Sequence, residues 1–355
     1  MKKPKAVVIV INHNGRIWLR RCLSSVAKSD YPNLEVYLVD NGSQDGSIEY
    51  ARGSFPSVKI IAYERNLGFP EAYNRAIDKV EADFVVLLNS DTEVLDHQWI
   101  NRLVDVATRD LKTIAVACKM VSMDDHSRLD SVGGMGIPFW RGFVDIGKEM
   151  LDRGQYDSDF EPFAFCGGAA LINRKMFQKI GRFDGKFFMY VEDADFSWRL
   201  RLLGYKVRLA PEARVAHYFS GTAHSKTIDE WKLYYCHRNF LRSMLKNCGP
   251  SLGWALGRCL LFSLLAAGGL AIPEPKKSVA IVKAMLWNVL NFRDTYTRRA
   301  CIQANRTVGE GEVLAKMYPR LCRHQPAQYQ HMRHILDILF EHSQLHRFLE
   351  NAEIT

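Results

Sequence analysis

The stretch Phe84-Val85-Val86-Leu87-Leu88-Asn89-Ser90-Asp91-Thr92 decides the fold. Its first five residues are apolar and run directly into a polar tip that holds one carboxylate, Asp91. A short apolar run bounded by polar residues predicts a strand that is buried on both faces. Because ligands of open α/β sheets bind outside the carboxyl ends of such strands, Asp91 is a candidate for handling a metal or a phosphate. On this stretch alone, an ordinary Asn-Ser-Asp turn is the competing interpretation.

Three similar units precede this strand. Strands are predicted at 6–11, 34–39 and 58–62. Helices are predicted to follow them at 16–28, at 47–52 with Ser47 as the cap, and at 70–80. Strands that alternate with helices indicate right-handed βαβ units and a mainly parallel sheet. Polar residues follow each strand: Asn12 and Asn14, Asp40 and Asn41, Asn66, and Asn89 with Asp91. Because these strand ends share one edge of the sheet, their repetition predicts a nucleotide site there.

The pattern continues less regularly after the fourth strand. A helix is predicted at 97–109 and a strand at 113–118, followed by an irregular excursion over 122–162 and a short strand at 206–210. Asp193 and Asp195 open a predicted helix over 194–203. Side chains two positions apart on a helix diverge by about 200°, so one carboxylate can face a cleft while the other is structural. We expect Asp195 to be the structural one.

Charge divides the chain into two regions. Residues 1–231 balance 31 Lys and Arg against 31 Asp and Glu, whereas residues 232–355 carry 17 against 8. A neutral body at 1–231 followed by a basic, mainly helical region at 232–355 predicts that the second region contacts an anionic surface, although a solvated helical surface would have the same composition. The eight cysteines are scattered, which favours reduced thiols in a cytosolic protein.

The basic region contains an apolar segment. Residues 252–272 hold one charge, Arg258, and the uninterrupted run of 14 residues that follows it is short for a spanning helix, which needs about 20. A second helix is predicted at 278–292, with Trp287 and flanking basic residues. This composition is typical of an interfacial membrane segment, and it is also compatible with a helical subdomain packed on residues 1–231 or with a homodimer interface.

A series of short motifs points to one family through its order, because each motif is weak alone. They are Asn12-His13-Asn14-Gly15, Asp40-Asn41-Gly42-Ser43, Asn66-Leu67-Gly68-Phe69 with Asn74, Asn89-Ser90-Asp91, Cys166-Gly167-Gly168, Gly181-Arg182-Phe183-Asp184, Glu192-Asp193-Ala194-Asp195, and Pro211 with His217. In this order they resemble the family-2 glycosyltransferases of the GT-A fold, in their rhamnosyltransferase-like branch. The resemblance covers residues 6–222 and implies a Rossmann-like, mainly parallel sheet flanked by helices.

The resemblance implies an inverting, metal-dependent transfer of a sugar from a nucleotide donor. It assigns Asp193 as the general base, Asp91 and His217 as ligands of Mg²⁺ or Mn²⁺, and Asp40 as the residue that binds the pyrimidine. It places the remaining donor contacts at Asn12, His13, Asn14, Asn66, Gly68, Asn74, Asn89, Gly168 and Glu192. The implied donor is dTDP-L-rhamnose or a UDP-hexose. The acceptor is a hydroxyl of a glycan or of a lipid-linked glycan in cell-surface polysaccharide synthesis.

Two departures from the family pattern matter. The first acidic position of the Asp-x-Asp motif is Asn89, which supplies no charge, and this substitution is familiar in the rhamnosyltransferase-like branch. The Gln-x-x-Arg-Trp pattern of processive polymerases is missing from the sequence, which favours transfer of one or a few sugars. Trp140 and Arg141 are candidates for contact with the acceptor.

Other functions are weaker matches to the sequence. A sugar-phosphate nucleotidyltransferase opens with a Gly-rich, basic phosphate loop, which Asn12-His13-Asn14-Gly15-Arg16 does not provide. A nucleic-acid binder needs basic and aromatic residues on one face, whereas the nucleotide-like motifs lie in the neutral region, so we expect no nucleic acid as a partner. A membrane-associated scaffold with an inactive transferase domain remains an alternative. We expect a cytoplasmic location, peripheral to the inner face of the membrane.

Overall fold

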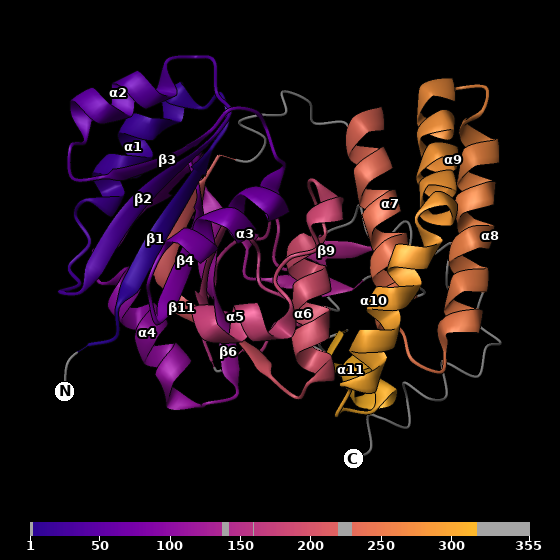
Figure 1. Cartoon of the computed structure of the whole chain (residues 1–355). Helices are drawn as coiled ribbons and strands as arrows, with labels where there is room; N and C mark the ends of the chain where they lie inside the picture. Colours follow the sequence, from indigo (N-terminus) through magenta and orange to yellow (C-terminus); the bar gives the residue numbers. More distant parts are fainter. Residues whose placement is uncertain (1–2, 137–141, 159, 219–228, 318–355) are drawn as a thin grey trace.

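One central sheet organises the computed structural model, which describes residues 3–136, 142–158, 160–218 and 229–317 (Figure 1). Its strands lie in the order β3-β2-β1-β4-β10-β6-β11-β5, and β7 pairs with β6. The first four strands along the chain run parallel: β1 (Ala6–Asn12), β2 (Leu34–Asn41), β3 (Lys59–Tyr63) and β4 (Phe84–Asn89). The register places Asn12 beside Asp40, so the polar strand ends meet at one edge as predicted.

The second half of the sheet mixes directions. β10 (Ala169–Asn173) lies antiparallel between β4 and β6 (Thr113–Ser122), and β11 (Lys206–His217) lies parallel to β6 and antiparallel to β5 (Thr92–Val94). With β7 (Leu129–Ser131) antiparallel to β6, six of the nine strands share one direction, which confirms a mainly parallel sheet. Two short strands, β8 (Gly134–Gly136) and β9 (Phe143–Asp145), form a hairpin inside the segment predicted as irregular.

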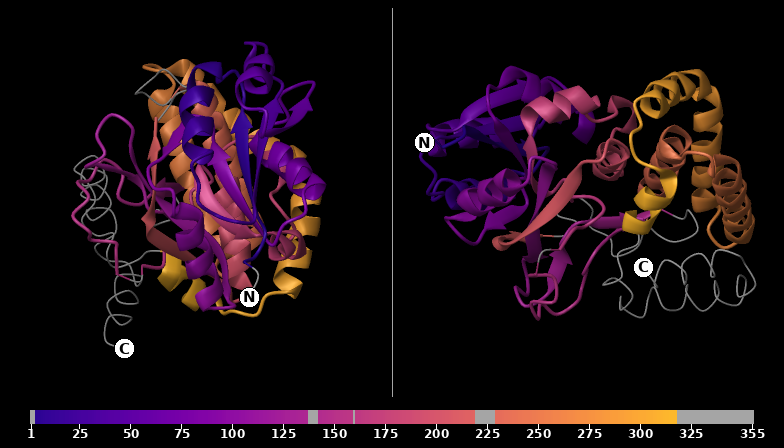
Figure 2. Two further views of the ribbon diagram at one scale, coloured as in Figure 1. Left: turned by 90° about the vertical axis from the view of Figure 1, so that its left-hand side faces the viewer. Right: turned by 90° about the horizontal axis from the view of Figure 1, so that it is seen from below.

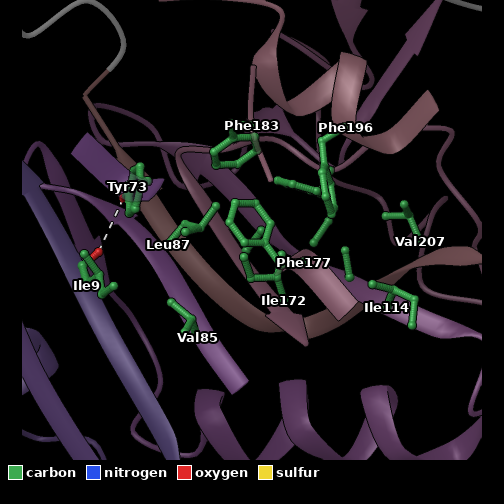
Figure 3. Packing of buried hydrophobic residues seen from close by; sticks show 14 of the residues in the cluster. Ile9, Tyr73, Val85, Leu87, Ile114, Ile172, Phe177, Phe183, Phe196 and Val207 are labelled. Atoms are coloured by element: carbon green, nitrogen blue, oxygen red, sulfur yellow. Dashed lines mark hydrogen bonds between the residues drawn. The ribbon is translucent and has the colours of Figure 1, made fainter. Parts of the chain in front are cut away.

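Helices cover both faces because each central strand is apolar on both sides. Val7 and Ile9 of β1 pack with α3 (Phe69–Lys79), α5 (Arg174–Ile180) and α6 (Glu192–Leu202). Figure 3 shows this cluster, in which Tyr73, Phe177 and Phe196 close over Val85 and Leu87. The alternate residues of the same strands pack with the helices of the other face, namely α1 (Arg16–Val26), α2 (Ser47–Ser54) and α4 (Trp99–Arg109). Two-sided burial is what the continuous apolar run of β4 predicts.

Two local predictions were wrong. Ser47 does not cap α2: the capping position is Gly46, and Asp45 accepts hydrogen bonds from both the backbone N–H and the hydroxyl of Ser47. β11 does not end before Pro211 but continues to His217. A register shift between Ala210 and Arg214 accommodates the proline, because a bulge needs no ladder hydrogen bond from that residue.

The basic C-terminal region is helical, as predicted. It contains α7 (Glu230–Asn247), α8 (Leu252–Leu270), α9 (Pro275–Leu290), α10 (Phe292–Ala304) and α11 (Glu310–Met317). Figure 1 shows α7 beside α6, with α8 and α9 on the far side of α7 from the sheet, and Figure 2 shows the same order from below. Residues from both regions share one apolar cluster that includes Trp198 of α6, Met244 of α7 and Cys259 of α8. The helices therefore extend the body of residues 1–231 directly.

Buried charges strengthen this junction. Asp184 accepts hydrogen bonds from Arg242 Nε (2.8 Å) and Lys246 Nζ (2.7 Å) of α7. Lys246 Nζ also lies 3.0 Å from Asp195, which pairs in turn with Arg199 at 3.0 Å. Burial opposes ionisation of Asp184, but Lys246 and Arg242 outweigh it and lower the pKa of that carboxyl far below its usual range. Asp195 is fully buried within this network, which confirms its predicted structural role.

Replacing Asp184 should weaken this junction strongly. Asp184→Ala leaves Arg242 and Lys246 buried without one of their counter-charges, so we expect a loss of about 3–5 kcal/mol in the free energy of unfolding by urea titration. The control is Asp78→Ala, which breaks the half-exposed pair with Arg182 and should cost about 1 kcal/mol or less. Equal losses in the two variants would contradict a structural role for the buried network.

Candidate active site

The loops after β1 and β2 are locked together around Asp40. Asn12 Nδ2 donates to Asp40 Oδ2 (3.1 Å) and to Ser43 Oγ (3.2 Å), and the backbone N–H of Ser43 donates to Asp40 Oδ1 (2.8 Å). Asn12 and Asp40 are buried. The two loops therefore form a single rigid wall at the carboxyl edge of the sheet.

His13 and Asn14 continue this wall toward the surface. Asn14 has a φ of +52°, its backbone N–H donates to Ser43 Oγ (2.9 Å), and its Oδ1 accepts from the N–H of Gln44 (2.8 Å). His13 Nδ1 lies 3.0 Å from the carbonyl oxygen of Asn41. Asparagine tolerates the left-handed conformation better than most residues, which suits it to this position.

The loop after β3 links the wall to a second part of the chain. Asn66 Oδ1 accepts from Asn41 Nδ2 (3.0 Å) and from the N–H of Gly68 (2.8 Å). Gly68 has a φ of +79°, and a Cβ there would lie 2.4 Å from the carbonyl oxygen of Phe188. Only glycine fits such an approach, so the close packing of residue 68 on the 188 turn depends on it.

Asn74, a predicted donor contact, is hydrogen-bonded inside the protein. Its Nδ2 donates to the carbonyl of Phe183 (3.0 Å), and its Oδ1 accepts from the N–H of the same residue (3.1 Å). Both polar atoms of the buried amide are thereby engaged inside the protein. This pairing gives Asn74 a structural role, and its predicted contact with the donor stays a prediction.

Asp91 and His217 are brought together by the sheet. β11 places His217 opposite Thr92, and His217 Nε2 lies 3.5 Å from Asp91 Oδ1. The other ring nitrogen, Nδ1, lies 2.7 Å from Asp130 Oδ2. Burial lowers the pKa of His217, but hydrogen bonds to Asp130 and Asp91 outweigh it and raise the pKa to about 10. A metal that binds Nε2 would therefore have to displace a proton from the ring.

This pair fits a divalent cation. Asp130 accepts a hydrogen bond from Nδ1 and so directs Nε2 toward Asp91, which is the usual way in which a carboxylate orients a metal-binding imidazole. One carboxylate oxygen and one imidazole nitrogen suit Mn²⁺ or Mg²⁺. Among the described residues there is no cluster of three or more His, Cys, Asp or Glu side chains with metal-binding geometry. The remaining ligands must therefore come from elsewhere, and donor phosphates are suitable oxygen ligands.

Asp193 lies at the N-terminal end of α6 beside two glycines. The N–H of Gly167 donates to Asp193 Oδ2 (2.8 Å), and the N–H of Ala194 donates to Oδ1 (2.7 Å). The carbonyl of Gly168 accepts from the N–H of Asn89 (2.9 Å) at the end of β4. Gly167 and Gly168 thus connect the carboxylate of Asp193 to the end of β4, and the chain continues from there to Asp91.

The two adjacent acidic residues differ in charge. Burial raises the pKa of Asp193 to about 6, although the hydrogen bond from the Gly167 N–H opposes the shift. Burial and then the charge of Asp193 raise the pKa of Glu192 well above its ordinary value. Asp193 can therefore act as a base near neutral pH, whereas burial and the charge of Asp193 both disfavour the ionised form of Glu192.

Three predicted donor contacts leave buried acceptors without partners in the described part of the chain. They are Asn12 Oδ1, Asn89 Oδ1 and Glu192 Oε2. Buried polar atoms are usually hydrogen-bonded, so unpaired atoms need an explanation. Their concentration at one sheet edge indicates a site for a ligand rich in hydroxyl and N–H donors.

The turn that carries Glu192 and Asp193 is strained. Phe188, Tyr190 and Val191 have φ values of +64°, +67° and +72°, and a β-branched residue such as Val191 rarely adopts this conformation. Each such residue costs on the order of 1–3 kcal/mol and persists only where its surroundings enforce it.

Asn239 of α7 enforces the turn. Its Nδ2 donates to the carbonyls of Phe187 (2.9 Å), Met189 (2.7 Å) and Tyr190 (2.9 Å). Arg238 Nε donates to Asn239 Oδ1 (2.9 Å), which fixes the orientation of the amide. The Arg238 guanidinium also donates to the carbonyls of Lys186 and Phe187.

Sequence reasoning missed Asp130, Arg238 and Asn239. Asp130 lies in the excursion at 122–162, where no pattern connects it to His217, 87 residues later. The Arg238-Asn239 pair lies in the region predicted to be mainly helical, but no helix was predicted over these two residues and no pattern connects them to the turn before Asp193. Trp140 and Arg141, proposed to contact the acceptor, lie outside the described residues.

This arrangement defines a class of enzyme, the nucleotide-sugar glycosyltransferases of the GT-A fold. Residues 7–181 match the family model of glycosyl transferase family 2, and the chain belongs to this family. The family and the fold expected from the sequence are thereby confirmed. The individual roles of the site residues stay predictions.

Relatives of known name support a rhamnosyltransferase-like branch. The O-antigen biosynthesis protein RfbC of Myxococcus xanthus is 26% identical over 67% of this chain, which spans only 19% of that protein. N-acetylglucosaminyl-diphospho-decaprenol L-rhamnosyltransferase of Mycobacterium tuberculosis is 28% identical over 59% of this chain and 75% of its own length.

Solved structures with the same fold contain nucleotide sugars or their parts. GalNAc-T7 with UDP, GalNAc and Mn²⁺ has a TM-score of 0.53 at 19% identity and covers 68% of this chain and 48% of its own. The mannosyltransferase PcManGT of Pyrobaculum calidifontis, with GDP-Man and Mn²⁺, has a TM-score of 0.51 at 18% identity and covers 86% of each chain. At these identities the likeness establishes the fold alone.

Replacing Asn239 should impair catalysis more than donor binding. Asn239→Ala removes the hydrogen bonds that hold the turn before Asp193, so we expect kcat to fall about 100-fold through misplacement of the carboxylate. Donor affinity, measured by calorimetry, should change little. The control is Asn173→Ala, which removes the cap of α5 and costs about 1 kcal/mol of stability without touching the turn. Equal loss of kcat in both variants would assign the effect to stability.

Proposed function

We propose that this chain is an inverting, metal-dependent glycosyltransferase. It transfers a sugar, for which dTDP-L-rhamnose is the favoured donor and a UDP-hexose the alternative, to a hydroxyl of a glycan or lipid-linked acceptor in cell-surface polysaccharide synthesis. The observation that carries the proposal is the glycine pair 167–168, which joins Asp193 to the end of β4 and so brings a base toward the strand end that leads to Asp91 and His217. The rhamnosyltransferase relative supports the choice of donor.

The reaction is a single displacement in which Asp193 acts first. The carboxylate takes the proton of the acceptor hydroxyl, the hydroxyl oxygen forms a bond to the anomeric carbon, and the bond from that carbon to the phosphate oxygen breaks. The nucleoside diphosphate leaves with the electron pair, and attack from the opposite face inverts the anomeric centre. A divalent cation held by Asp91, His217 and the donor phosphates would stabilise the charge on the leaving group.

The chain's own residues bind and orient the donor. The wall formed by Asn12, His13, Asn14 and Asp40 lies where the nucleoside would bind, with Asn66 and Gly68 along the ribose and diphosphate. The unpaired oxygens of Asn89 and Glu192 would accept hydrogen bonds from sugar or ribose hydroxyls. Burial and the charge of Asp193 raise the pKa of Glu192, which disfavours a second charge next to the base.

Asp193→Asn should abolish turnover while donor binding survives. The amide is close in shape to the carboxylate but cannot accept the proton, so we expect kcat to fall by about 10²–10⁴-fold, measured by release of the nucleoside diphosphate. In the wild-type enzyme kcat/KM should fall as the pH drops through about 6, because the base then becomes protonated. Burial of Asp193 sets that range, and the charge of Asp145 adds to the shift. Full activity in Asp193→Asn would mean that another group is the base.

Donor binding should depend on a metal and on Asp91. Calorimetry with dTDP-L-rhamnose and UDP-hexoses, each with Mn²⁺ or Mg²⁺, should show binding that EDTA removes and that Asp91→Ala abolishes. The matched control is Glu93→Ala, which removes a carboxylate two residues away that pairs with Arg21 at the surface. Donor binding that is unchanged in Asp91→Ala or in EDTA would refute the metal site. Binding of neither donor class would refute the proposed donor.

A further inference from the structure

The burial pattern of α8 is reversed relative to that of a helix in a water-soluble core. The residues that α8 buries are small: Ala255, Cys259, Ser263 and Ala267. The large side chains point outward, with Leu261, Leu264 and Leu265 exposed at 56%, 59% and 63%. A surface helix in water normally turns its large apolar residues toward the core and polar residues outward. Small residues at a helix interface with large apolar residues outside are typical of helices in contact with lipid.

α9 continues the same apolar surface. It buries one large apolar residue, Ile281, together with Ala280, Ala284 and Asn288, and it exposes Val282, Leu286 and Val289. The exposed Phe292 and Tyr296 of α10 stack on each other with ring centroids 5.9 Å apart. Twelve of the seventeen exposed large hydrophobic residues in the described part of the chain lie between Trp254 and Tyr296. We call the exposed side of α8, α9 and the start of α10 the apolar face. A patch of this extent marks an interaction site.

Charge around the apolar face has one sign. From 250 to 293 the chain has a single acidic residue, Glu274, against Arg258, Lys276, Lys277, Lys283 and Arg293. Lys276 and Lys283 are exposed. Each basic residue near an anionic bilayer contributes about 1 kcal/mol to binding, and apolar side chains enter the boundary between headgroups and acyl chains. A lipid surface with anionic headgroups therefore matches both the apolar and the basic character of this face.

Hydrogen bonds hold α8 and α9 flat against α7. Ser263 Oγ of α8 lies 2.8 Å from His237 Nε2 of α7, and Asn288 Nδ2 of α9 donates to the carbonyl of Arg238 (3.0 Å). Figure 1 shows the three helices side by side. α8 is long and apolar enough to cross a membrane, with 22% of its apolar window buried. Spanning would separate α8 from these contacts with α7, whereas binding in the plane of the interface keeps them.

We propose that the apolar face docks the protein on an anionic membrane surface, with α8 and α9 lying in the plane of the lipid headgroups. Asn288 bonds the main chain of Arg238, next to the residue that holds the catalytic turn. The docked helices are therefore one helix layer from Asp193. Docking adds a location to the proposed transferase and suits an acceptor anchored in lipid, but it does not depend on catalysis.

Vesicle co-sedimentation tests the docking without donor or acceptor. We expect the protein to bind vesicles of phosphatidylcholine with phosphatidylglycerol, more weakly at high salt and more weakly to phosphatidylcholine alone. Leu261→Ser combined with Leu264→Ser and Leu265→Ser should weaken binding about 100-fold, because the serines remove the inserted apolar area. Lys276→Glu with Lys283→Glu should reduce binding to the anionic vesicles selectively.

Leu111→Ser is the matched control, since Leu111 is 93% exposed but lies far along the chain from the apolar face, between α4 and β6. It should bind vesicles as the wild type does, and thermal unfolding should confirm that all variants are folded. Absence of wild-type binding at low salt would overturn the proposal. A dimer would also overturn the proposal if light scattering showed that it dissociates in the triple leucine variant while vesicle binding is unchanged or absent. The apolar face would then join two copies of this chain.

Discussion

The amide of Asn239 is the constraint on which the candidate active site depends. Phe188, Tyr190 and Val191 have positive φ values, and such strained residues persist only where their surroundings hold them. The amide donates to three carbonyls of this turn. Arg238 fixes the amide from behind and bonds two carbonyls itself. The strain places Asp193 at the first turn of α6 with Gly167 against its carboxylate, a position that relaxed backbone would not reach.

Helix α7 of the C-terminal region therefore helps to position Asp193, the proposed base. α7 carries Asn239 on the turn and, a few residues on, Arg242 and Lys246 in the buried network with Asp184 and Asp195. Those carboxylates flank the turn in the sequence, so α7 holds it from both sides. A change in the packing of α8 or α9 on α7 can reach Asp193 through this helix. The neutral region and the basic region are distinct in composition, but residues of both hold the turn that carries Asp193, the proposed base.

Local pattern made much of this fold predictable. The apolar runs of β1, β2 and β4, and the polar residues after them, are properties of contiguous sequence, and their periodicity is sufficient to place them. Asp130, by contrast, reaches His217 only because β7 and β11 both pair with β6, a relation that no local pattern encodes. The motif of Asn74 likewise gave no sign that its amide pairs with the backbone of Phe183, 109 residues later. The orientation of α8 was also unpredictable, because its sequence is apolar all round and only packing shows that the small side is inside.

The charge balance of the site explains how Asp91 alone can serve at the end of β4, where the family's Asp-x-Asp motif has two carboxylates. A second anion at position 89 would lie near Asp91, and the donor's diphosphate brings further negative charge to the same edge. Asn89 offers a hydrogen-bond acceptor there without adding charge. The environment of Glu192 acts in a similar direction, because burial and the neighbouring Asp193 raise its pKa and disfavour its charged form. Each of these residues keeps an acceptor oxygen for a hydroxyl. The proposed reaction uses Asp91, which pairs with His217 where a metal would bind, and Asp193, which would face the acceptor.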